Sequence, residues 1–177
     1  MNAFESLGLP VGLVISDEEI REAFRKRAAV AHPDSGGDEV EFSTMQAARE
    51  VLLSPAGRVK EWLAAQGLEV DARGQIEAGL MDLFQKVAEC GSAAEAAIKE
   101  GQVAQSALAK AMAEVKLMSQ RERVEELIAQ VEGEITSRVS AFPEVETGGK
   151  DAAKVMRDLV FLEKWRGTLK GIYGRLM

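Results

Sequence analysis

Apolar residues recur every three or four positions along most of this 177-residue chain, which is the spacing of amphipathic helices. The pattern predicts helical segments, in chain order, over residues 2–9, 16–31, 38–54, 59–65, 75–89, 92–118, 119–142 and 151–175. Three of these segments begin with a serine followed three residues later by a glutamate, the sequence signature of a capping box. The pairs are Ser16 with Glu19, Ser92 with Glu95, and Ser119 with Glu122. We therefore expect a nearly all-α protein.

The chain has only 4 prolines, and hydrophobic residues make up 46% of it, which is enough for a buried core. A polar stretch punctuated by glycines, residues 67–74, separates two groups of predicted helices. This predicts an N-terminal domain over 1–66, a linker over 67–74 and a C-terminal domain over 75–177. We expect the first domain to contain an antiparallel helical hairpin. We expect the second to be an antiparallel bundle of three or four helices.

The sequence His32-Pro33-Asp34 lies between the two predicted hairpin helices, and His32 is the single histidine of the chain. Proline disfavours the helical conformation of the residue before it, so the first hairpin helix should end at His32. Gly36 and Gly37 then favour an exposed turn. We expect the tripeptide to face water at this helix–loop junction. On its own, however, such a tripeptide is also an ordinary way to end a helix.

Three basic residues, Arg21, Arg25 and Lys26, lie away from the apolar face of the first hairpin helix. At about 100° per residue, Arg21, Arg25 and His32 fall on one side of that helix. One interpretation is a docking surface that continues into the tripeptide. The other is a solvated helix face, which is how most runs of charge are used.

The predicted helix over 75–89 carries more apolar surface than one helix–helix contact requires. Leu80 belongs to its narrow apolar stripe, whereas Met81 and Phe84 lie about 60–120° further round the helix. In the last predicted helix, Phe161 and Trp165 lie off the apolar stripe in the same way. Either neighbouring elements cover these side chains, or the side chains form an exposed patch that binds a protein client.

The segment over 92–118 is rich in alanine and carries an apolar stripe of its own. The stripe consists of Ala104, Leu108, Ala111, Val115 and Met118. Small side chains let two helices approach closely, so we expect this stripe to pack against a neighbouring helix.

Charge and residue types exclude several classes of function. The net charge of −7 argues against nucleic-acid binding through a general electrostatic field. Cys90 is the single cysteine, so we expect neither a disulfide framework nor a cysteine-based metal site. We find no catalytic constellation and no phosphate-binding loop, and we expect no cofactor and no enzymatic activity. No apolar run approaches the length of a membrane span and no export signal begins the sequence, so we expect a cytoplasmic protein without membrane partners.

The motifs of the N-terminal domain, taken in order, resemble a J domain. The resemblance rests on Phe4–Leu9, Ile20–Arg27, His32-Pro33-Asp34, Gln46–Pro55 and Arg58. It implies a co-chaperone that docks on a DnaK-type ATPase and triggers ATP hydrolysis, which locks a client in the chaperone. The residues that would stimulate the ATPase are His32, Pro33 and Asp34, and those that would dock on the chaperone are Arg21, Arg25 and Lys26.

The resemblance extends to the HscB family through Trp62–Gly67, Leu80-Met81 and Arg157–Lys164. Members of that family join an N-terminal J domain to a C-terminal helical bundle. They deliver the iron–sulfur scaffold protein IscU to the DnaK-type chaperone HscA. The resemblance therefore implies an IscU-like client, bound by the matching apolar residues Leu80, Met81, Phe84 and Phe161.

Two other interpretations stay open. Gln85, Val87 and Ala88 stand where acidic neighbours of the apolar patch are expected, which favours a J-domain co-chaperone with a different client, or an assembly adaptor. In a purely structural helical protein the His-Pro-Asp tripeptide would be incidental. The ordered match across the whole first domain argues against that last interpretation.

Overall fold

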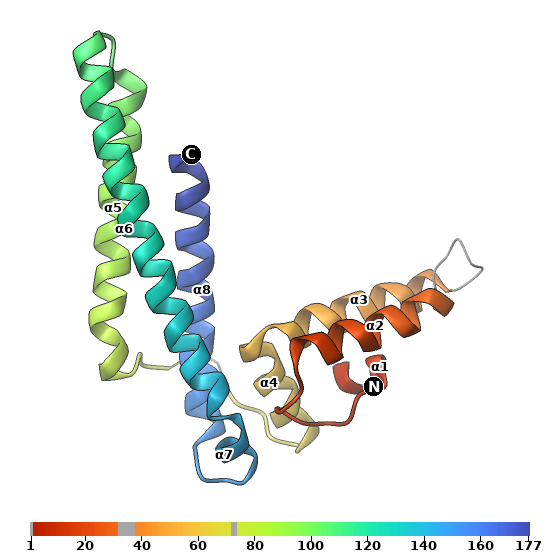
Figure 1. Ribbon diagram of the computed structural model, residues 1–177. Helices are drawn as coiled ribbons and strands as arrows, with labels where there is room; N and C mark the ends of the chain where they lie inside the picture. Colours follow the sequence, from red (N-terminus) through yellow and green to blue (C-terminus); the bar gives the residue numbers. More distant parts are fainter. Residues whose placement is uncertain (1, 32–37, 72–73) are drawn as a thin grey trace. The chain divides into compact units, whose positions relative to one another are not determined.

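The computed structural model describes residues 2–31, 38–71 and 74–177, and within these ranges the chain forms eight helices and no strand (Figure 1). The helices are α1 (Ala3–Leu7), α2 (Asp17–Ala31), α3 (Glu39–Leu53), α4 (Pro55–Ala65), α5 (Ala78–Val103), α6 (Ala107–Ser140), α7 (Phe142–Glu146) and α8 (Ala152–Leu176). The all-α prediction is confirmed. By its contacts, the chain divides into two compact units, residues 1–74 with 138–159 and residues 75–137 with 160–177.

Helices α2 and α3 pack against each other as the predicted hairpin, and α1 packs across both. Their apolar faces meet in one buried cluster, formed by Phe4, Leu7, Ile20, Ala31, Met45, Ala48 and Leu52. Near the middle of the hairpin the Phe24 and Phe42 rings lie 6.2 Å apart, and the Arg49 guanidinium lies 4.5 Å from the Phe24 ring centroid. The Arg49 Nε is a buried nitrogen without a hydrogen-bond partner. The attraction between the guanidinium and the Phe24 ring offsets part of the cost of burying it.

The start of α2 is fixed by the predicted capping box. The Ser16 N–H donates to Glu19 Oε2 over 2.8 Å, and the Glu19 N–H donates to Ser16 Oγ over 3.2 Å. The Ser16 hydroxyl also donates to Glu19 Oε2 over 2.7 Å, and this bond, together with the one from the Ser16 N–H, stabilises the charged carboxylate and lowers the pKa of Glu19. The chain therefore enters α2 in a defined direction, which sets the orientation of the basic residues further along the helix.

Ser54 ends α3 and also caps α4, so the two helices are separated by one residue. Its hydroxyl accepts a hydrogen bond from the Gly57 N–H over 2.9 Å. A Cβ atom at Gly57 would lie 2.4 Å from the Val51 carbonyl oxygen, so only glycine permits this close approach. The predicted start of this helix at residue 59 was wrong. Pro55 is compatible with the first helical turn, because the N–H that proline lacks has no partner there.

Among the residues of the first unit that the structure describes, Arg58 of α4 is the most deeply buried charged one. Its Nε donates to the Leu52 carbonyl over 2.9 Å, and one terminal nitrogen donates to the Ile15 carbonyl over 2.6 Å. The other terminal nitrogen pairs with Asp17 Oδ1 at 2.8 Å. One guanidinium thus joins the end of α3, the loop before α2 and the first residue of α2.

The first unit also contains α7 and the first turns of α8. The Glu146 side chain of α7 accepts a hydrogen bond from the backbone N–H of Leu13, in the loop between α1 and α2. Arg138 and Asp158 form a largely buried ion pair with 3.5 Å between their charged atoms. The segment over 143–149 was predicted as a loop. Its first part is the short helix α7 because Phe142 and Val145 are buried on one side of it.

In the second unit α5 and α6 run antiparallel, with α8 alongside them (Figure 1). Their inner faces supply the buried residues Leu80, Leu83, Val87, Cys90, Val124, Leu127, Val131, Leu162, Trp165 and Leu169. Polar pairs link the helices outside this core. Glu132 of α6 pairs with Lys170 at 2.9 Å, and the Tyr173 hydroxyl donates to Glu125 over 2.6 Å. The latter hydrogen bond stabilises the protonated phenol and raises the pKa of Tyr173.

Several predicted helix boundaries in this unit were wrong. Helix α5 continues through Gly91 and Ser92, where a break was expected, and α6 continues through Ser119. The Ser92 hydroxyl donates to the Ala88 carbonyl over 3.2 Å, so this serine lies within the helix instead of capping a new one. The connection between α5 and α6 lies at residues 104–106, and the helix expected from residue 75 begins at Ala78.

The alanine-rich stripe predicted to pack against a helix is mostly exposed. Leu108, Val115 and Met118 face solvent, whereas Ala113 of the same helix is buried. Ala104 of the predicted stripe lies in the connection between α5 and α6, and the opposite face of α6 packs against its neighbour.

Replacing Arg58 by methionine should destabilise the first unit by about 3–5 kcal/mol, because the Leu52 and Ile15 carbonyls and Asp17 lose a buried donor. Asp17→Asn is the matched control and should cost less than about 1 kcal/mol, since Asp17 is half-exposed. Urea unfolding followed by helical circular dichroism measures both variants. Equal stability losses in the two variants would contradict the central role given to Arg58.

Candidate functional site

The tripeptide His32-Pro33-Asp34 lies outside the described residues, between the end of α2 at Ala31 and the start of α3 at Glu39. The described helix ends on either side of it expose large apolar side chains, Val30 on α2 and Val40 on α3. The sequence interpretation did not select these valines as site residues. Their exposure beside the hairpin end makes them additional candidate contacts.

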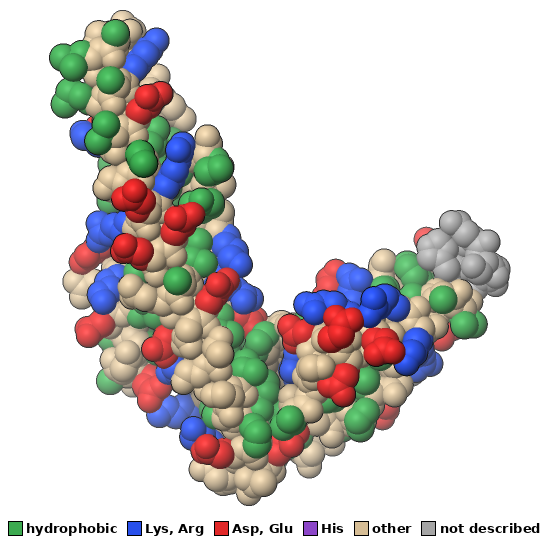
Figure 2. All heavy atoms as spheres, in the orientation of Figure 1, with side chains coloured by type: hydrophobic (Ala, Val, Ile, Leu, Met, Phe, Trp, Pro, Cys, Tyr) green, Lys and Arg blue, Asp and Glu red, His purple; other side chains and the backbone are tan. Residues whose placement is uncertain are grey.

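The predicted docking residues Arg21, Arg25 and Lys26 are exposed on α2, but each already has an acidic neighbour. Arg25 pairs with Glu18 at 2.5 Å, and Lys26 pairs with Glu22 at 2.8 Å. The Lys26 ammonium stabilises the carboxylate, which lowers the pKa of Glu22. Figure 2 shows acidic and basic side chains interspersed over this part of the molecule. A partner must therefore displace acidic neighbours to reach the basic groups.

The charges of α2 are also separated along the helix. Its acidic residues are Asp17, Glu18, Glu19 and Glu22, and its basic residues are Arg21, Arg25, Lys26 and Arg27. The charges of the two sets cancel, but the acidic residues lie nearer the N-terminus of α2 and the basic residues lie nearer residues 32–34 in the sequence. Arg27 is held in place, because its guanidinium donates to the Glu5 carbonyl over 3.0 Å. The positive half of α2 thus adjoins the tripeptide.

Three aromatic rings of the second unit form a cluster across α5 and α8. Trp165 lies between Phe84 and Phe161, with ring centroids 5.7 Å and 6.2 Å away, and only 6% of Trp165 is exposed. Phe84 is 40% exposed and Met81 is 47% exposed, as the sequence interpretation expected for a surface patch. We call Met81, Phe84, Phe161 and Trp165 the aromatic patch.

Two of the predictions for this patch need correction. Trp165 was placed off the apolar stripe of its helix, but it is buried because α8 packs against two other helices. Leu80, predicted to contact the client, is only 1% exposed. It supports the patch from the core and offers no surface to a partner. Phe161 is half-buried, so the exposed apolar surface is supplied mainly by α5.

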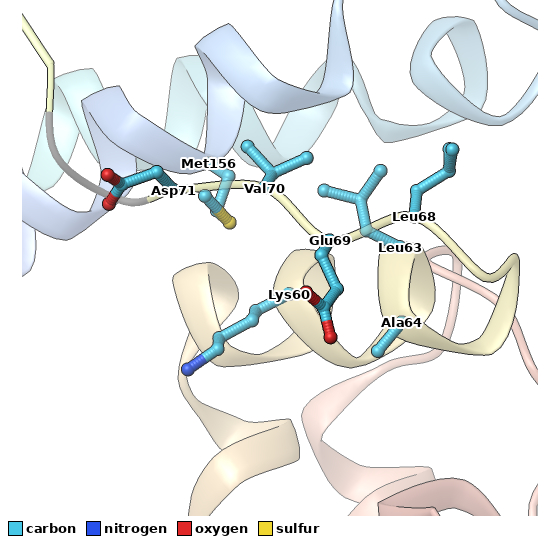
Figure 3. A pocket seen from close by; sticks show the side chains of 8 residues that line it. All are labelled: Lys60, Leu63, Ala64, Leu68, Glu69, Val70, Asp71 and Met156. Carbon is cyan, nitrogen blue, oxygen red and sulfur yellow. The ribbon is translucent and has the colours of Figure 1, made fainter.

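A groove of about 570 Å³ lies within the first unit, between α4, the following segment and Met156 of α8 (Figure 3). Leu63, Leu68 and Val70 supply apolar lining, while Lys60, Glu69 and Asp71 carry its charges. The lining is therefore partly apolar and partly charged.

Two features are absent from residues 2–31, 38–71 and 74–177. No three histidine, cysteine, aspartate or glutamate side chains there are grouped so that they could hold a metal ion. None of the helices in those ranges has the length and apolarity that crossing a membrane requires.

Within the aromatic patch, the loss of unfolding free energy on substitution should increase with the buried fraction of the side chain that is replaced. Trp165→Ala should cost about 3–5 kcal/mol, since it removes a buried ring, whereas Met81→Ser should stay within about 0.5 kcal/mol. Phe84→Ala should lie between them, at about 1 kcal/mol, because it loses mainly the contact with Trp165. Thermal unfolding of the three variants by circular dichroism measures this order. A loss for Met81→Ser as large as that for Trp165→Ala would show that Met81 belongs to the core.

Residues 2–60 match the family model of the DnaJ domain. Over 55 residues, 31% of this chain, the sequence is 42% identical to "Chaperone protein dnaJ A6" of Oryza sativa subsp. japonica and 40% identical to "Chaperone protein dnaJ 3" of Arabidopsis thaliana. The chain spans only 13% of the length of each of these two relatives.

The fold of the whole chain is similar to that of "Chaperone HscB from Vibrio cholerae", with a TM-score of 0.59 and 19% sequence identity over all of both chains. At that identity the likeness concerns the fold. Together with the helical hairpin described above, the comparisons establish that this protein has an N-terminal DnaJ domain within an HscB-like fold.

Proposed function

We propose that this chain is a J-domain co-chaperone that stimulates the ATPase of a DnaK- or HscA-type chaperone and delivers an iron–sulfur scaffold client of the IscU type. The observation that carries the proposal is the DnaJ domain over residues 2–60, which includes His32-Pro33-Asp34 and is followed by an HscB-like helical region. The chemical step, ATP hydrolysis, belongs to the partner. This chain would act on it by binding, and we expect it to do so in the cytoplasm.

On the chaperone side, the proposed contact begins with Arg21, Arg25 and Lys26 and continues to the tripeptide. Exposed ion pairs such as Arg25 with Glu18 are worth little in water, so an acidic chaperone surface can replace the glutamate at small cost. Such contacts mainly set the rate at which the two proteins meet and the position in which they dock. Asp34 would then offer its carboxylate to an arginine of the chaperone through a charge-assisted hydrogen bond.

On the client side, the aromatic patch supplies the apolar contact. Trp165 fixes the orientation of Phe84 and Phe161 before any client arrives, so little side-chain freedom is lost on binding. Large apolar side chains in a fixed arrangement are typical of binding hot spots. Met81 adds a flexible apolar side chain that can adapt to the shape of a client.

A second candidate is the same co-chaperone with a different client or with an assembly partner. The observation that favours it is that Gln85, where the resemblance leads us to expect a carboxylate, is uncharged. Gln85 lies one turn beyond Met81, and its side-chain amide donates to Glu89 over 2.9 Å. A carboxylate at position 85 would instead add a negative charge next to the patch.

In a single-turnover assay, the chain should stimulate ATP hydrolysis by a DnaK- or HscA-type chaperone, and His32→Gln should remove the whole stimulation. The circular dichroism of that variant should stay unchanged, because His32 was predicted to lie outside the core. Ser35→Ala, one residue beyond the tripeptide, is the matched control and should keep the stimulation. Full stimulation by His32→Gln would overturn the chaperone half of the proposal.

A scaffold protein of the IscU type should bind the wild-type chain, and Met81→Ser with Phe84→Ser should weaken that binding by about 10–100-fold. Met118→Ser changes an exposed methionine outside the aromatic patch and is the matched control. Isothermal titration calorimetry measures all three proteins. If the scaffold does not bind while the ATPase is stimulated, the client assignment fails and the second candidate replaces it.

A further inference from the structure

On one side of α2 a single carboxylate contacts both arginines of the proposed docking surface. Glu18 Oε1 accepts a hydrogen bond from Arg25 over 2.5 Å, and Glu18 Oε2 lies 3.9 Å from the Arg21 guanidinium. At about 100° per residue, positions 18, 21 and 25 fall within about 60° of one another on the helix. Glu18 thus occupies the two groups that a chaperone would have to reach.

The other acidic residue on this side, Asp17, is less free to move. It lies 3.7 Å from Arg21, but its second oxygen pairs with the buried guanidinium of Arg58 at 2.8 Å. Moving Asp17 away would leave that buried charge without its partner, which is costly. Glu18 has no such constraint. Its side chain is 67% exposed, and among the described residues its charged partners are the two arginines.

The charges on this side of α2 cancel, because Asp17 and Glu18 match Arg21 and Arg25. The field that would steer an acidic partner toward these arginines is therefore weak. Removing the charge of Glu18 leaves a net positive charge there and frees the exposed Arg25 guanidinium. The loss of this acidic residue should then improve docking, which is the opposite of what is expected for the loss of an arginine.

We propose that Glu18 is a specificity-determining residue of the docking surface, because it competes within the chain for Arg21 and Arg25. This inference rests on the proposed function, since it requires that these arginines dock on a chaperone. A partner must replace Glu18 at two guanidinium groups that lie about 6 Å apart along the helix axis. A chaperone with carboxylates at that spacing recovers both ion pairs, whereas a less acidic surface does not displace Glu18.

The competition predicts how docking depends on salt. In the wild-type chain docking exchanges one set of ion pairs for another, so the number of pairs changes little. When position 18 carries no charge, docking forms new ion pairs, and salt screens these. The affinity of such a variant should exceed that of the wild type at low salt and approach it at high salt.

Surface plasmon resonance of the full chain on an immobilised DnaK- or HscA-type chaperone tests the competition. At about 50 mM salt, Glu18→Gln should bind about threefold more tightly than the wild type, mainly through faster association. At about 500 mM salt the two chains should bind alike. Glu50→Gln removes the same charge from an exposed position on α3 and is the matched control. A gain in Glu50→Gln as large as that in Glu18→Gln would contradict the proposal.

A double-mutant cycle with Arg25→Ala tests whether the gain arises from the contact itself. Arg25→Ala alone should weaken binding, because it removes a docking group. In that background Glu18→Gln should give little gain, since the hydrogen bond between the two side chains is already absent. An equal gain in both backgrounds would show that Glu18 acts only through the net charge, and the proposed competition would then be wrong.

Glu18 also lies in the first turn of α2, where a carboxylate stabilises the helix. If this were its only role, Glu18→Gln would lower the thermal stability measured by circular dichroism and leave chaperone binding unchanged. Unchanged binding, with a wild-type chain that does bind, overturns this inference alone. A wild-type chain that binds no chaperone at either salt concentration overturns the proposed function, and the inference falls with it.

Discussion

The N-terminal unit depends on one buried guanidinium. Burying an arginine is costly unless every donor finds a partner, and Arg58 meets this condition with carbonyls from two separate segments and with Asp17. The carbonyl of Ile15 belongs to the loop before α2, so the guanidinium supplies a donor to the loop while the loop supplies an acceptor to the buried charge. Because Asp17 is the first residue of α2, the same interaction fixes where the basic face begins.

The parts of this fold that could be predicted from the sequence are those governed by local rules. The Ser16–Glu19 capping box and the hairpin formed by α2 and α3 depend on neighbouring residues and on one apolar face. The same reasoning failed at Ser92 because a serine inside a helix can donate to a carbonyl one turn earlier, as Ser92 does to Ala88. Gly91 costs the helix some stability, but the packing of α5 along its whole length outweighs that local cost.

Periodicity shows that a helix has two unlike faces, but it does not show how much of each face neighbouring helices cover. Trp165 was therefore misjudged, since α8 contacts two helices and buries a wider arc than one stripe. The alanine-rich part of α6 was misjudged in the opposite sense, because no described helix lies against its outer face. For Met81 and Phe84 the sequence left burial and exposure open, and both are partly exposed because they lie away from the core stripe of α5. The tripeptide His32-Pro33-Asp34 lies outside the described residues, so its predicted geometry stays a prediction.

The two proposed binding surfaces differ in what binding would cost. On α2 the basic groups are held by exposed carboxylates, and exchanging one exposed ion pair for another changes the free energy by about 1 kcal/mol or less. Such a surface can associate and dissociate rapidly, which suits repeated docking on an ATPase. Binding at the aromatic patch instead removes apolar area from water around a ring that is already fixed. The patch should therefore strengthen client binding mainly by slowing dissociation of the client. A co-chaperone that holds its client while it meets successive chaperones requires a complex with the client that lasts longer than each complex with a chaperone.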